Sequence, residues 1–437
     1  MSKKKRLIGL LYIAVLCSQG LCAQTRQMSI EELFRLADEQ SKSIQTYRTG
    51  AESAEEALKA AKAQRLPDVN VSLSANYWGN GKLWDRDFGN AMTVDMPHFG
   101  NNFALEAQQV IYAGGAISSG IKQAEIGKAL AELDLQKNVQ EIRFLLVGHY
   151  LNVYKLDNQI RVVQKNMELI EEFIANMKAR REQGTVLKND ITRYELQKEQ
   201  LNLQLSRVED ARKIANHQLV TALHLPEGTE ISPDTYLLER QILTLTEDDW
   251  QDMAETNNIL LKQTQAAIQM NEQKVKQERS ERLPHISIVA AEHLDGPITI
   301  EVPVLDNNFN YWYIGIGVKY NLSSLFKNNK KLKQARLNVR QAQELHQLAQ
   351  EQVENAVQEG YVNFLTAFTD LRTQKNSVKL ADENYNVTEN RYKNEMALLT
   401  DMLDASNMKL TADLGLVNTR INILYNYYKM KYITHTL

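Results

Sequence analysis

The chain has 437 residues, of which 43% are hydrophobic and 24% are charged, with 51 lysines and arginines against 54 aspartates and glutamates. The net charge of −3 offers no basic surplus for the phosphates of a nucleic acid, so nucleic acid is not expected as a partner. Only seven prolines occur, and none lies between Pro97 and Pro226 or after Pro303, which leaves room for very long helices.

The first 23 residues are expected to be a secretory signal peptide. Lys3–Arg6 is a basic start, Leu7–Leu16 is an apolar run too short to span a bilayer as a helix, and Ala23 is a small residue before the cleavage point. Cys17 and Cys22 both lie in this segment, so the mature chain would have no thiol for a disulfide, a metal site or a nucleophile. Each cysteine follows a leucine rather than a small residue, which argues against lipidation. Without the signal, 47 basic residues face 54 acidic ones, a net charge of −7.

The sequence contains a long internal repeat. Arg65–Val71 (RLPDVNV) returns as Arg282–Ile288 (RLPHISI) at an offset of 217 residues. Further along the offset is 211, so that Asp190 corresponds to Asp401. The two halves are therefore one duplicated structural unit that differs by six residues in one loop. The expected domains are the signal peptide 1–23, a first repeat 24–226, an equatorial connector 227–245 and a second repeat 246–437.

Long helices are predicted to dominate each repeat. Nothing in residues 118–182 breaks a helix, which at ~1.5 Å per residue gives a length of about 100 Å. Apolar residues recur there, over Val139–Met177, at an average step of about 3.5, which is typical of left-handed coiled-coil packing. The rhythm continues over Ile191–Ala222, and Gly184 supplies the residue that a helix C-terminus prefers. The pattern predicts helices that double back on each other.

Four segments instead alternate between apolar and small or polar residues. They are Val69–Tyr77, Phe103–Gln108, Ile286–Ala290 and Trp312–Tyr320. Aromatic residues gather at their ends, as at a membrane interface. Since no stretch after the signal approaches the ~18 apolar residues of a transmembrane helix, membrane insertion would have to use strands. The pattern predicts outer-membrane strands with apolar side chains outward, and the alternative is a soluble sheet with one wet face.

Membrane strands would require several copies of the chain. Lipid satisfies no backbone group at an open sheet edge, so the strands must close into a barrel. The smallest such barrels have about eight strands. Several protomers would therefore each contribute four strands.

Motifs in each repeat resemble those of one family. They are Leu66-Pro67 and Leu283-Pro284 before strands, Tyr112–Gly115 before a long helix, and Arg391-Tyr392 followed by Asp401–Ala405. In this order, and duplicated, they resemble the TolC family of outer-membrane efflux proteins over essentially the whole mature chain.

The resemblance implies a mainly α fold with a membrane β-barrel: a homotrimer with a twelve-stranded barrel in outer-membrane lipid and an α-helical periplasmic tunnel. It implies an exit duct that catalyses nothing and needs no cofactor. Its partners would be a periplasmic adaptor (a membrane fusion protein) and an inner-membrane pump of the RND, ABC or MFS type. The alternatives are the outer-membrane channel of type I protein secretion and a structural coiled-coil protein of the periplasm without a pore. The sequence does not choose among drugs, metal ions and proteins as cargo.

In the family, aspartates that follow the turn between the two long helices of the second half form a ring at the periplasmic entrance, and Asp401 and Asp404 match them. Their i, i+3 spacing puts both carboxylates on one helix face, and a trimer would concentrate them at the pore constriction. Asp190 is the first-half counterpart of Asp401. The alternative is that these residues only begin helices, where acidic side chains favour the dipole.

The two turns between long helices are the expected adaptor-docking tips. Their residues are Gly184, Thr185 and Val186 in the first half and Glu395, Met396 and Ala397 in the second. The second turn departs from the family, because Glu395 stands where glycine is common. Ala397 also replaces an arginine that in some members tethers neighbouring helices in the closed state. Arg391, Lys393 or Arg180 could substitute for that arginine.

No other chemistry is predicted. The eight histidines are scattered without a metal-ligand pattern, so no metal site is expected. No nucleophile elbow, phosphate loop or cofactor fingerprint occurs, so no catalytic residues are assigned. A basic run follows the fourth strand, and it is predicted to be a solvated helical face, with lipid headgroups as the alternative contact. Its residues are Lys327, Lys330, Lys331, Lys333 and Arg336.

Overall fold

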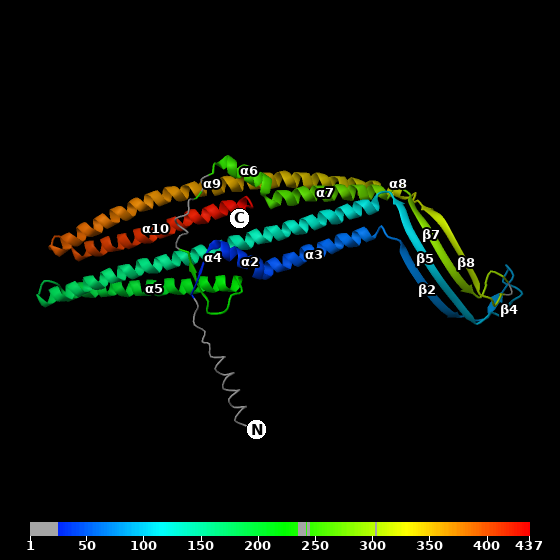
Figure 1. The fold of residues 1–437 in the computed structure, drawn as a ribbon, viewed down its shortest axis with the longest axis horizontal. Coiled ribbons are helices and arrows are strands. Elements are labelled where there is room, and N and C mark those ends of the chain that lie inside the picture. Colours follow the sequence, from blue (N-terminus) through cyan, green and yellow to red (C-terminus); the bar gives the residue numbers. More distant parts are fainter. Residues whose placement is uncertain (1–24, 235–241, 243–244, 302–303) are drawn as a thin grey trace, which may run out of the picture. The chain divides into compact units, whose positions relative to one another are not determined.

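The computed structural model describes residues 25–234, 242, 245–301 and 304–437 (Figure 1). The expected signal peptide, residues 1–23, lies outside these ranges, and so do residues 235–241, 243 and 244 of the expected connector. Contacts divide the chain into two compact units. The first unit is made of Met1–Arg48, Asp134–Lys262 and Ala349–Leu437, and the second of Thr49–Leu133 and Gln263–Leu348. Each unit therefore combines segments of both halves of the sequence.

The six main elements of the two halves follow the same order. The first contains α2 (Ile30–Gln40), α3 (Lys42–Ala63), β2 (Asp68–Tyr77), β5 (Phe99–Ala113), α4 (Ala116–Glu182) and α5 (Lys188–Ala222). The second contains α6 (Glu247–Asn257), α7 (Ile259–Ser280), β7 (His285–Gly296), β8 (Phe309–Lys319), α9 (Asn329–Lys393) and α10 (Leu399–Ile433). Corresponding helices have 11 residues in α2 and α6, 22 in α3 and α7, 67 and 65 in α4 and α9, and 35 in α5 and α10. The predicted duplication is confirmed.

The second unit contains a four-stranded antiparallel sheet with the order β2-β5-β7-β8. All four predicted strands are present, although β5 (Phe99–Ala113) and β7 (His285–Gly296) are longer than predicted. The register pairs Val71 with Leu105 and Ile288 with Ile316. Because side chains alternate along a strand, this register brings the apolar residues of the four strands onto one face. A short hairpin of β3 (Gly81–Leu83) and β4 (Met92–Val94) follows β2.

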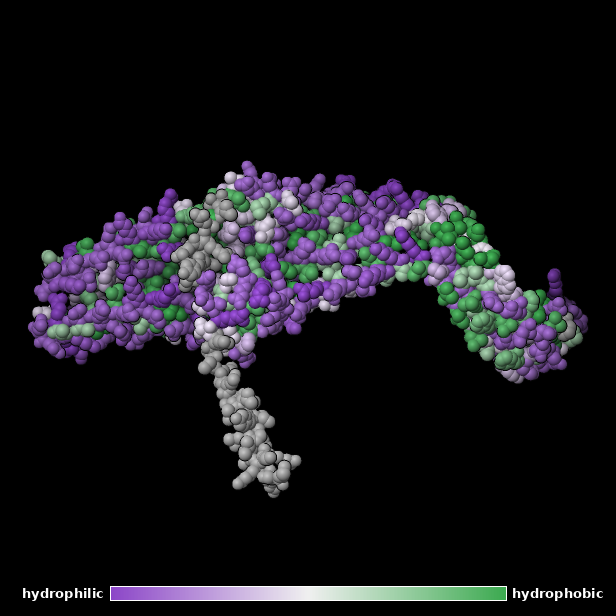
Figure 2. All heavy atoms as spheres, viewed as in Figure 1, coloured by the Kyte–Doolittle hydropathy of each residue, from purple (hydrophilic) through white to green (hydrophobic). Residues whose placement is uncertain are grey.

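The apolar face of this sheet is open to solvent in the single chain. Leu73, Trp312 and Ile316 are 77%, 73% and 75% exposed. Figure 2 shows hydrophobic residues gathered over these strands, whereas the helices present a mostly polar surface. The strands at the two edges, β2 and β8, each have one neighbour in the sheet. The sheet therefore offers both an apolar face and two hydrogen-bonding edges to other molecules.

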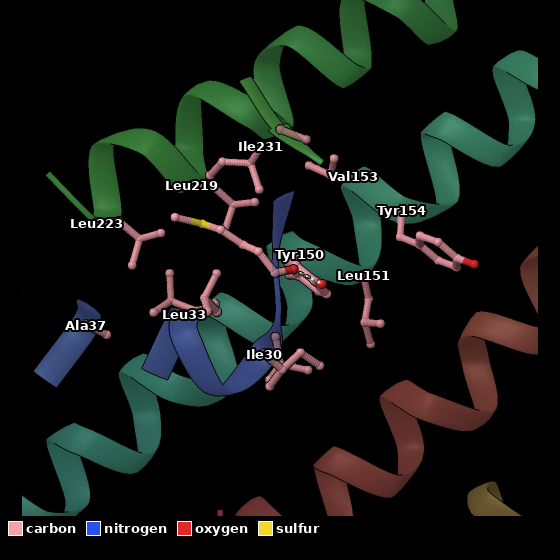
Figure 3. Close-up of a cluster of buried hydrophobic side chains, with 14 of the residues drawn as sticks. Ile30, Leu33, Ala37, Tyr150, Leu151, Val153, Tyr154, Leu219, Leu223 and Ile231 are labelled. Atoms are coloured by element: carbon pink, nitrogen blue, oxygen red, sulfur yellow. Dashed lines mark hydrogen bonds between the residues drawn. The ribbon is translucent and has the colours of Figure 1, made fainter. Parts of the chain in front are cut away.

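The first unit has a core where helices meet a small parallel sheet. That sheet pairs β1 (Thr25–Met28) with β6 (Glu230–Pro233). Ile30 and Leu33 of α2 pack there with Tyr150 of α4, Leu219 of α5 and Ile231 of β6 (Figure 3). The side chain of Ser29 caps the start of α2 by accepting a hydrogen bond from the N–H of Glu32 at 3.2 Å. This core anchors the central part of α4 and the C-terminal half of α5.

The long helices form two hairpins within the first unit. Residues 183–187 join α4 to α5, and residues 394–398 join α9 to α10. The helix predicted for residues 118–182 is confirmed as α4, and Gly184 follows its end. A second apolar core joins all four helices near these turns. Its buried residues are Val163, Ile170, Phe173, Ile174, Met177, Ile191, Tyr194, Leu201, Tyr385, Leu399 and Met402.

None of the helices in the described ranges contains an apolar stretch of the length that a bilayer crossing needs.

Candidate functional site

The two hairpin turns have the same backbone conformation. In the first, Gly184 has a φ of +80°, and the N–H of Thr185 donates to the carbonyl of Arg180 at 3.1 Å. In the second, Glu395 has a φ of +64°, and the N–H of Met396 donates to the carbonyl of Arg391 at 2.7 Å. A left-handed residue with this backward hydrogen bond is a common way to end a helix. Glu395 thus adopts a conformation that favours glycine.

An ion pair joins the two turns. A guanidinium nitrogen of Arg180, at the end of α4, lies 3.1 Å from the carboxylate of Glu395. The same guanidinium group lies over the ring of Tyr392, 5.9 Å from its centroid. Glu395 therefore reaches the other hairpin from its strained position, as glycine could not. Sequence reasoning named both residues but did not pair them.

The other two basic candidates stay within their own hairpin. Arg391 donates from its guanidinium group to the carbonyl of Met396 at 3.2 Å, which closes the second turn. Lys393 lies 3.1 Å from the carboxylate of Glu389, one turn earlier on α9. Of the three cations that could replace the missing arginine, only Arg180 has a described partner in the other hairpin.

Three aromatic rings pack behind the ion pair. The ring of Phe173 lies 4.6 Å from that of Tyr194 and 5.2 Å from that of Tyr392, centroid to centroid. The hydroxyl of Tyr194 is buried without a hydrogen-bond partner among the described residues. Burial raises the pKa of this hydroxyl well above its ordinary value. The aromatic side chains of α4, α5 and α9 therefore form one apolar contact next to the turns.

Exposed leucines occupy the same position in both turns. Leu187 precedes α5 and is 71% exposed, and Leu398 precedes α10 and is 69% exposed. Met396 is exposed beside Leu398. Sequence reasoning missed both leucines, although the offset of 211 residues relates them. The tips are therefore apolar at their ends as well as charged.

The predicted pore aspartates are placed at helix starts. The carboxylate of Asp401 accepts a hydrogen bond of 3.0 Å from the N–H of Leu398, so it caps α10 as the helix-start alternative requires. Asp404 is exposed one turn later. Asp190 begins α5 and is partly buried. Burial raises the pKa of Tyr392, and the carboxylate of Asp190 adds to this effect while Arg180 opposes it. One chain thus supplies carboxylates from both hairpins, and a ring would need further copies.

The described residues contain no group of three His, Cys, Asp or Glu side chains arranged to hold a metal ion.

The sequence and the fold are both similar to those of known outer membrane proteins. The sequence model of the family described as outer membrane efflux protein matches residues 33–223 and 250–427, which is most of the chain. No curated protein sequence matches. The outer membrane protein VceC of Vibrio cholerae is 14% identical, with a TM-score of 0.78 over 93% of this chain and 96% of that chain.

Two further solved structures share the fold at similar identity. The MtrE outer membrane channel of Neisseria gonorrhoeae is 14% identical, with a TM-score of 0.73 over 93% of this chain and 88% of that chain. The CmeC outer membrane channel of Campylobacter jejuni is 15% identical, with a TM-score of 0.73 over 93% of this chain and 85% of that chain. The family match spans both repeats, in agreement with the resemblance to the TolC family, and this chain belongs to the outer membrane efflux protein family.

Proposed function

We propose that the protein is the outer-membrane exit duct of a tripartite efflux pump. It passively conducts small molecules, delivered by an inner-membrane transporter and a periplasmic adaptor, to the cell exterior. The observation that carries this proposal is the four-stranded sheet, whose exposed face is apolar and whose edge strands β2 and β8 each lack a second neighbour. Such a sheet is stable in lipid only after its edges are paired.

Three copies would pair those edges in a ring. In a closed trimer, β8 of one protomer pairs with β2 of the next, which gives twelve strands from the four of each chain. The helical hairpins of the three copies form the tunnel on the periplasmic side. Each chain has two similar hairpins, so three chains place six similar hairpins around the axis of the tunnel. The duplication thereby makes the wall of the tunnel nearly uniform.

The hairpin tips are the proposed adaptor-docking sites. The residues concerned are Gly184, Thr185, Val186, Glu395, Met396 and Ala397, and we add Leu187 and Leu398. The exposed apolar side chains of Leu187, Met396 and Leu398 support this role, because an apolar centre with a polar rim is typical of a protein interface. Asp401 and Asp404, with Asp190 as a further candidate, are proposed to line the constriction of the pore.

Conductance and transport separate this function from its alternatives. The purified protein should give discrete single-channel conductance in planar lipid bilayers, whereas a structural coiled-coil protein should give none. Cells that lack the chain should accumulate a fluorescent small-molecule dye, and expression of the chain should restore its export. Restored secretion of a protein substrate, with dye accumulation unchanged, would assign the duct to type I secretion instead.

A further inference from the structure

The segment between β8 and α9 carries a cluster of exposed cations. Three lysines lead it, Lys327 at the end of the short helix α8 (Ser324–Lys327) and Lys330 and Lys331 at the start of α9. Lys333 and Arg336 continue it on α9. All five are exposed, and among the described residues none of them forms an ion pair. Five positive charges without an acidic partner repel one another unless an anion from outside the chain lies near them.

Hydrogen bonds hold this segment in a defined conformation. The side-chain oxygen of Asn321 accepts from both the N–H (3.2 Å) and the hydroxyl (2.7 Å) of Ser323. The guanidinium group of Arg282 donates to the carbonyl of Leu325 at 2.9 Å and to the side chain of Asn329 at 2.7 Å. The buried side chain of Asn328 donates to the carbonyl of Glu278. The outward presentation of the lysines is therefore built into the fold.

The same segment continues the apolar face of the sheet. Val318, near the end of β8, is 66% exposed, and Leu322 and Phe326 beyond it are 64% and 66% exposed. Tyr320 and Leu325 are also exposed. An apolar surface thus runs from β8 through α8 and ends at the lysines. Apolar and aromatic side chains followed by lysines match the change from the apolar interior of a membrane to its charged headgroups.

The first repeat shows that the junction folds without the cluster. At the offset of 211 residues, Lys327, Lys330 and Lys331 correspond to Ala116, Ser119 and Gly120. The counterpart of Lys333 is Lys122, whose ammonium group is 2.9 Å from a carboxylate oxygen of Glu125. The equivalent strand-to-helix junction therefore carries no unpaired basic cluster. The lysines of the second half are an addition to the repeat and have to be explained separately.

We propose that residues 320–333, named here the basic foot, bind the phosphate groups of anionic phospholipids in the leaflet next to the helices. The inference rests on the proposed insertion of the strands into a membrane, because that insertion places the foot at headgroup depth. Leu322, Leu325 and Phe326 would enter the boundary of the acyl chains, while Lys327, Lys330 and Lys331 contact phosphates. In a trimer the feet alternate with neutral first-repeat junctions, so the lipid contacts have three-fold rather than six-fold symmetry.

Lipid retention by the purified full-length protein tests this proposal. The protein in mild detergent is titrated with phosphatidylglycerol or phosphatidylcholine, and bound lipid is counted by native mass spectrometry at low salt. The test variant is Lys327→Gln, Lys330→Gln and Lys331→Gln together. Each lysine near an anionic lipid surface is worth roughly a five-fold change in partitioning, so roughly 100-fold weaker retention of phosphatidylglycerol is expected at most. Retention of phosphatidylcholine should not change.

A matched control removes the same charge elsewhere on α9. Arg372, Lys375 and Lys379 are exposed cations of the first unit, and their replacement by glutamine should leave phosphatidylglycerol retention at the wild-type value. Rising salt should weaken retention in the wild type and the control, because screening acts on exposed charges. Inorganic phosphate at millimolar concentration should not displace the lipid.

Three results would overturn the proposal. Equal retention of phosphatidylglycerol by the test variant would make the foot a solvated helical face. Displacement of the lipid by inorganic phosphate would make it a site for free anions. Dissociation of the test variant into monomers on native gels would make it a contact between copies. Single-channel conductance of the wild-type protein, measured in parallel, reports on the duct itself. Its absence would count against the proposed function, whereas conductance together with equal retention by the test variant would count against the lipid site alone.

Discussion

At the residue scale, Glu395 combines a strained backbone conformation with a carboxylate that pairs with Arg180 of the other hairpin. A side chain at its φ of +64° costs about 1 kcal/mol. Its ion pair with Arg180 is partly exposed, with the Glu395 carboxylate mostly in solvent, and is worth at most about 1 kcal/mol. We predict that Glu395→Gly is about as stable as the wild type, because it loses the ion pair but also the strain. Glu395→Gln keeps the strain and loses the pair, so it should be about 1 kcal/mol less stable than Glu395→Gly. Thermal unfolding followed by circular dichroism measures the difference.

Gly184 provides the matched control for this comparison. Its φ is +80°, and no atom lies within 4 Å of where an added Cβ would be, so Gly184→Ala reports conformational strain alone. It should lower the free energy of unfolding by about 1 kcal/mol. A Glu395→Gly variant that is less stable than the wild type would show that the ion pair outweighs the strain, and one that is less stable than Glu395→Gln would show that the left-handed conformation costs nothing at this position.

Two buried tyrosines should respond oppositely to loss of the hydroxyl. The hydroxyl of Tyr194 is buried without a described partner, so Tyr194→Phe should leave the free energy of unfolding unchanged or raise it by up to about 1 kcal/mol. The hydroxyl of Tyr150 donates to the carbonyl of Met28 at 2.6 Å and accepts from the N–H of Asp234 at 2.8 Å. Tyr150→Phe leaves those groups without this partner and should lower the free energy of unfolding by about 1–3 kcal/mol. Equal effects of both substitutions would contradict the described contacts.

At the element scale, the apolar anchors of the hairpin tips give a test of adaptor docking. Replacement of Leu187 and Leu398 by glutamine removes two exposed apolar side chains without adding charge or bulk. We predict that affinity for the adaptor, measured with the purified partner by surface plasmon resonance, falls about 30-fold, because truncation of an interface residue that contributes to binding costs about 1 kcal/mol or more and two are truncated here. Trimer yield should not change.

A leucine on the shaft of the hairpin serves as the control. Leu196 of α5 is 61% exposed, and Leu196→Gln should leave adaptor affinity unchanged. Equal losses from the tip and the shaft variants would place the docking surface along the helices instead.

The elements were predicted from sequence wherever a pattern ran long enough. The stretch without helix-breaking residues located α4 to within two residues of its start, and the repeat of Arg65–Val71 located β7 from β2. The hairpin of β3 and β4 was not predicted, because strands of three residues are too short to show alternation. The pair of Arg180 and Glu395 was not predicted either. It joins residues 215 positions apart, and its existence depends on how two hairpins pack.

At the scale of the whole molecule, the aspartates test whether copies of the chain converge on one pore. Asp401→Asn and Asp404→Asn together remove the charge, while the side-chain oxygen of asparagine can still accept the bond from the N–H of Leu398. We therefore predict a loss of cation preference and of block by trivalent cations from the periplasmic side, with stability changed by less than about 1 kcal/mol.

Reversal potentials in planar bilayers measure this selectivity. Asp190→Asn alone should have a smaller effect if Asp190 lies outside the narrowest ring. Unchanged selectivity in the double variant would leave Asp401 and Asp404 with helix-starting roles only.

The edges of the sheet decide whether the chain closes into a trimer. The N–H groups of adjacent residues in a strand point to opposite sides, so in β2 one of Ser72 and Leu73 directs its N–H toward β5 and the other directs it away from the sheet. Proline removes that N–H.

In an open monomeric sheet, only the proline that replaces the residue whose N–H faces β5 should be disruptive, because an outward N–H at an edge has no partner to lose. In a closed ring, β2 also pairs with β8 of the next protomer, so Ser72→Pro and Leu73→Pro should both reduce the heat-modifiable trimer on SDS gels. If one of the two variants keeps the full amount of trimer, β2 is a free edge and the trimer is held by the helices alone.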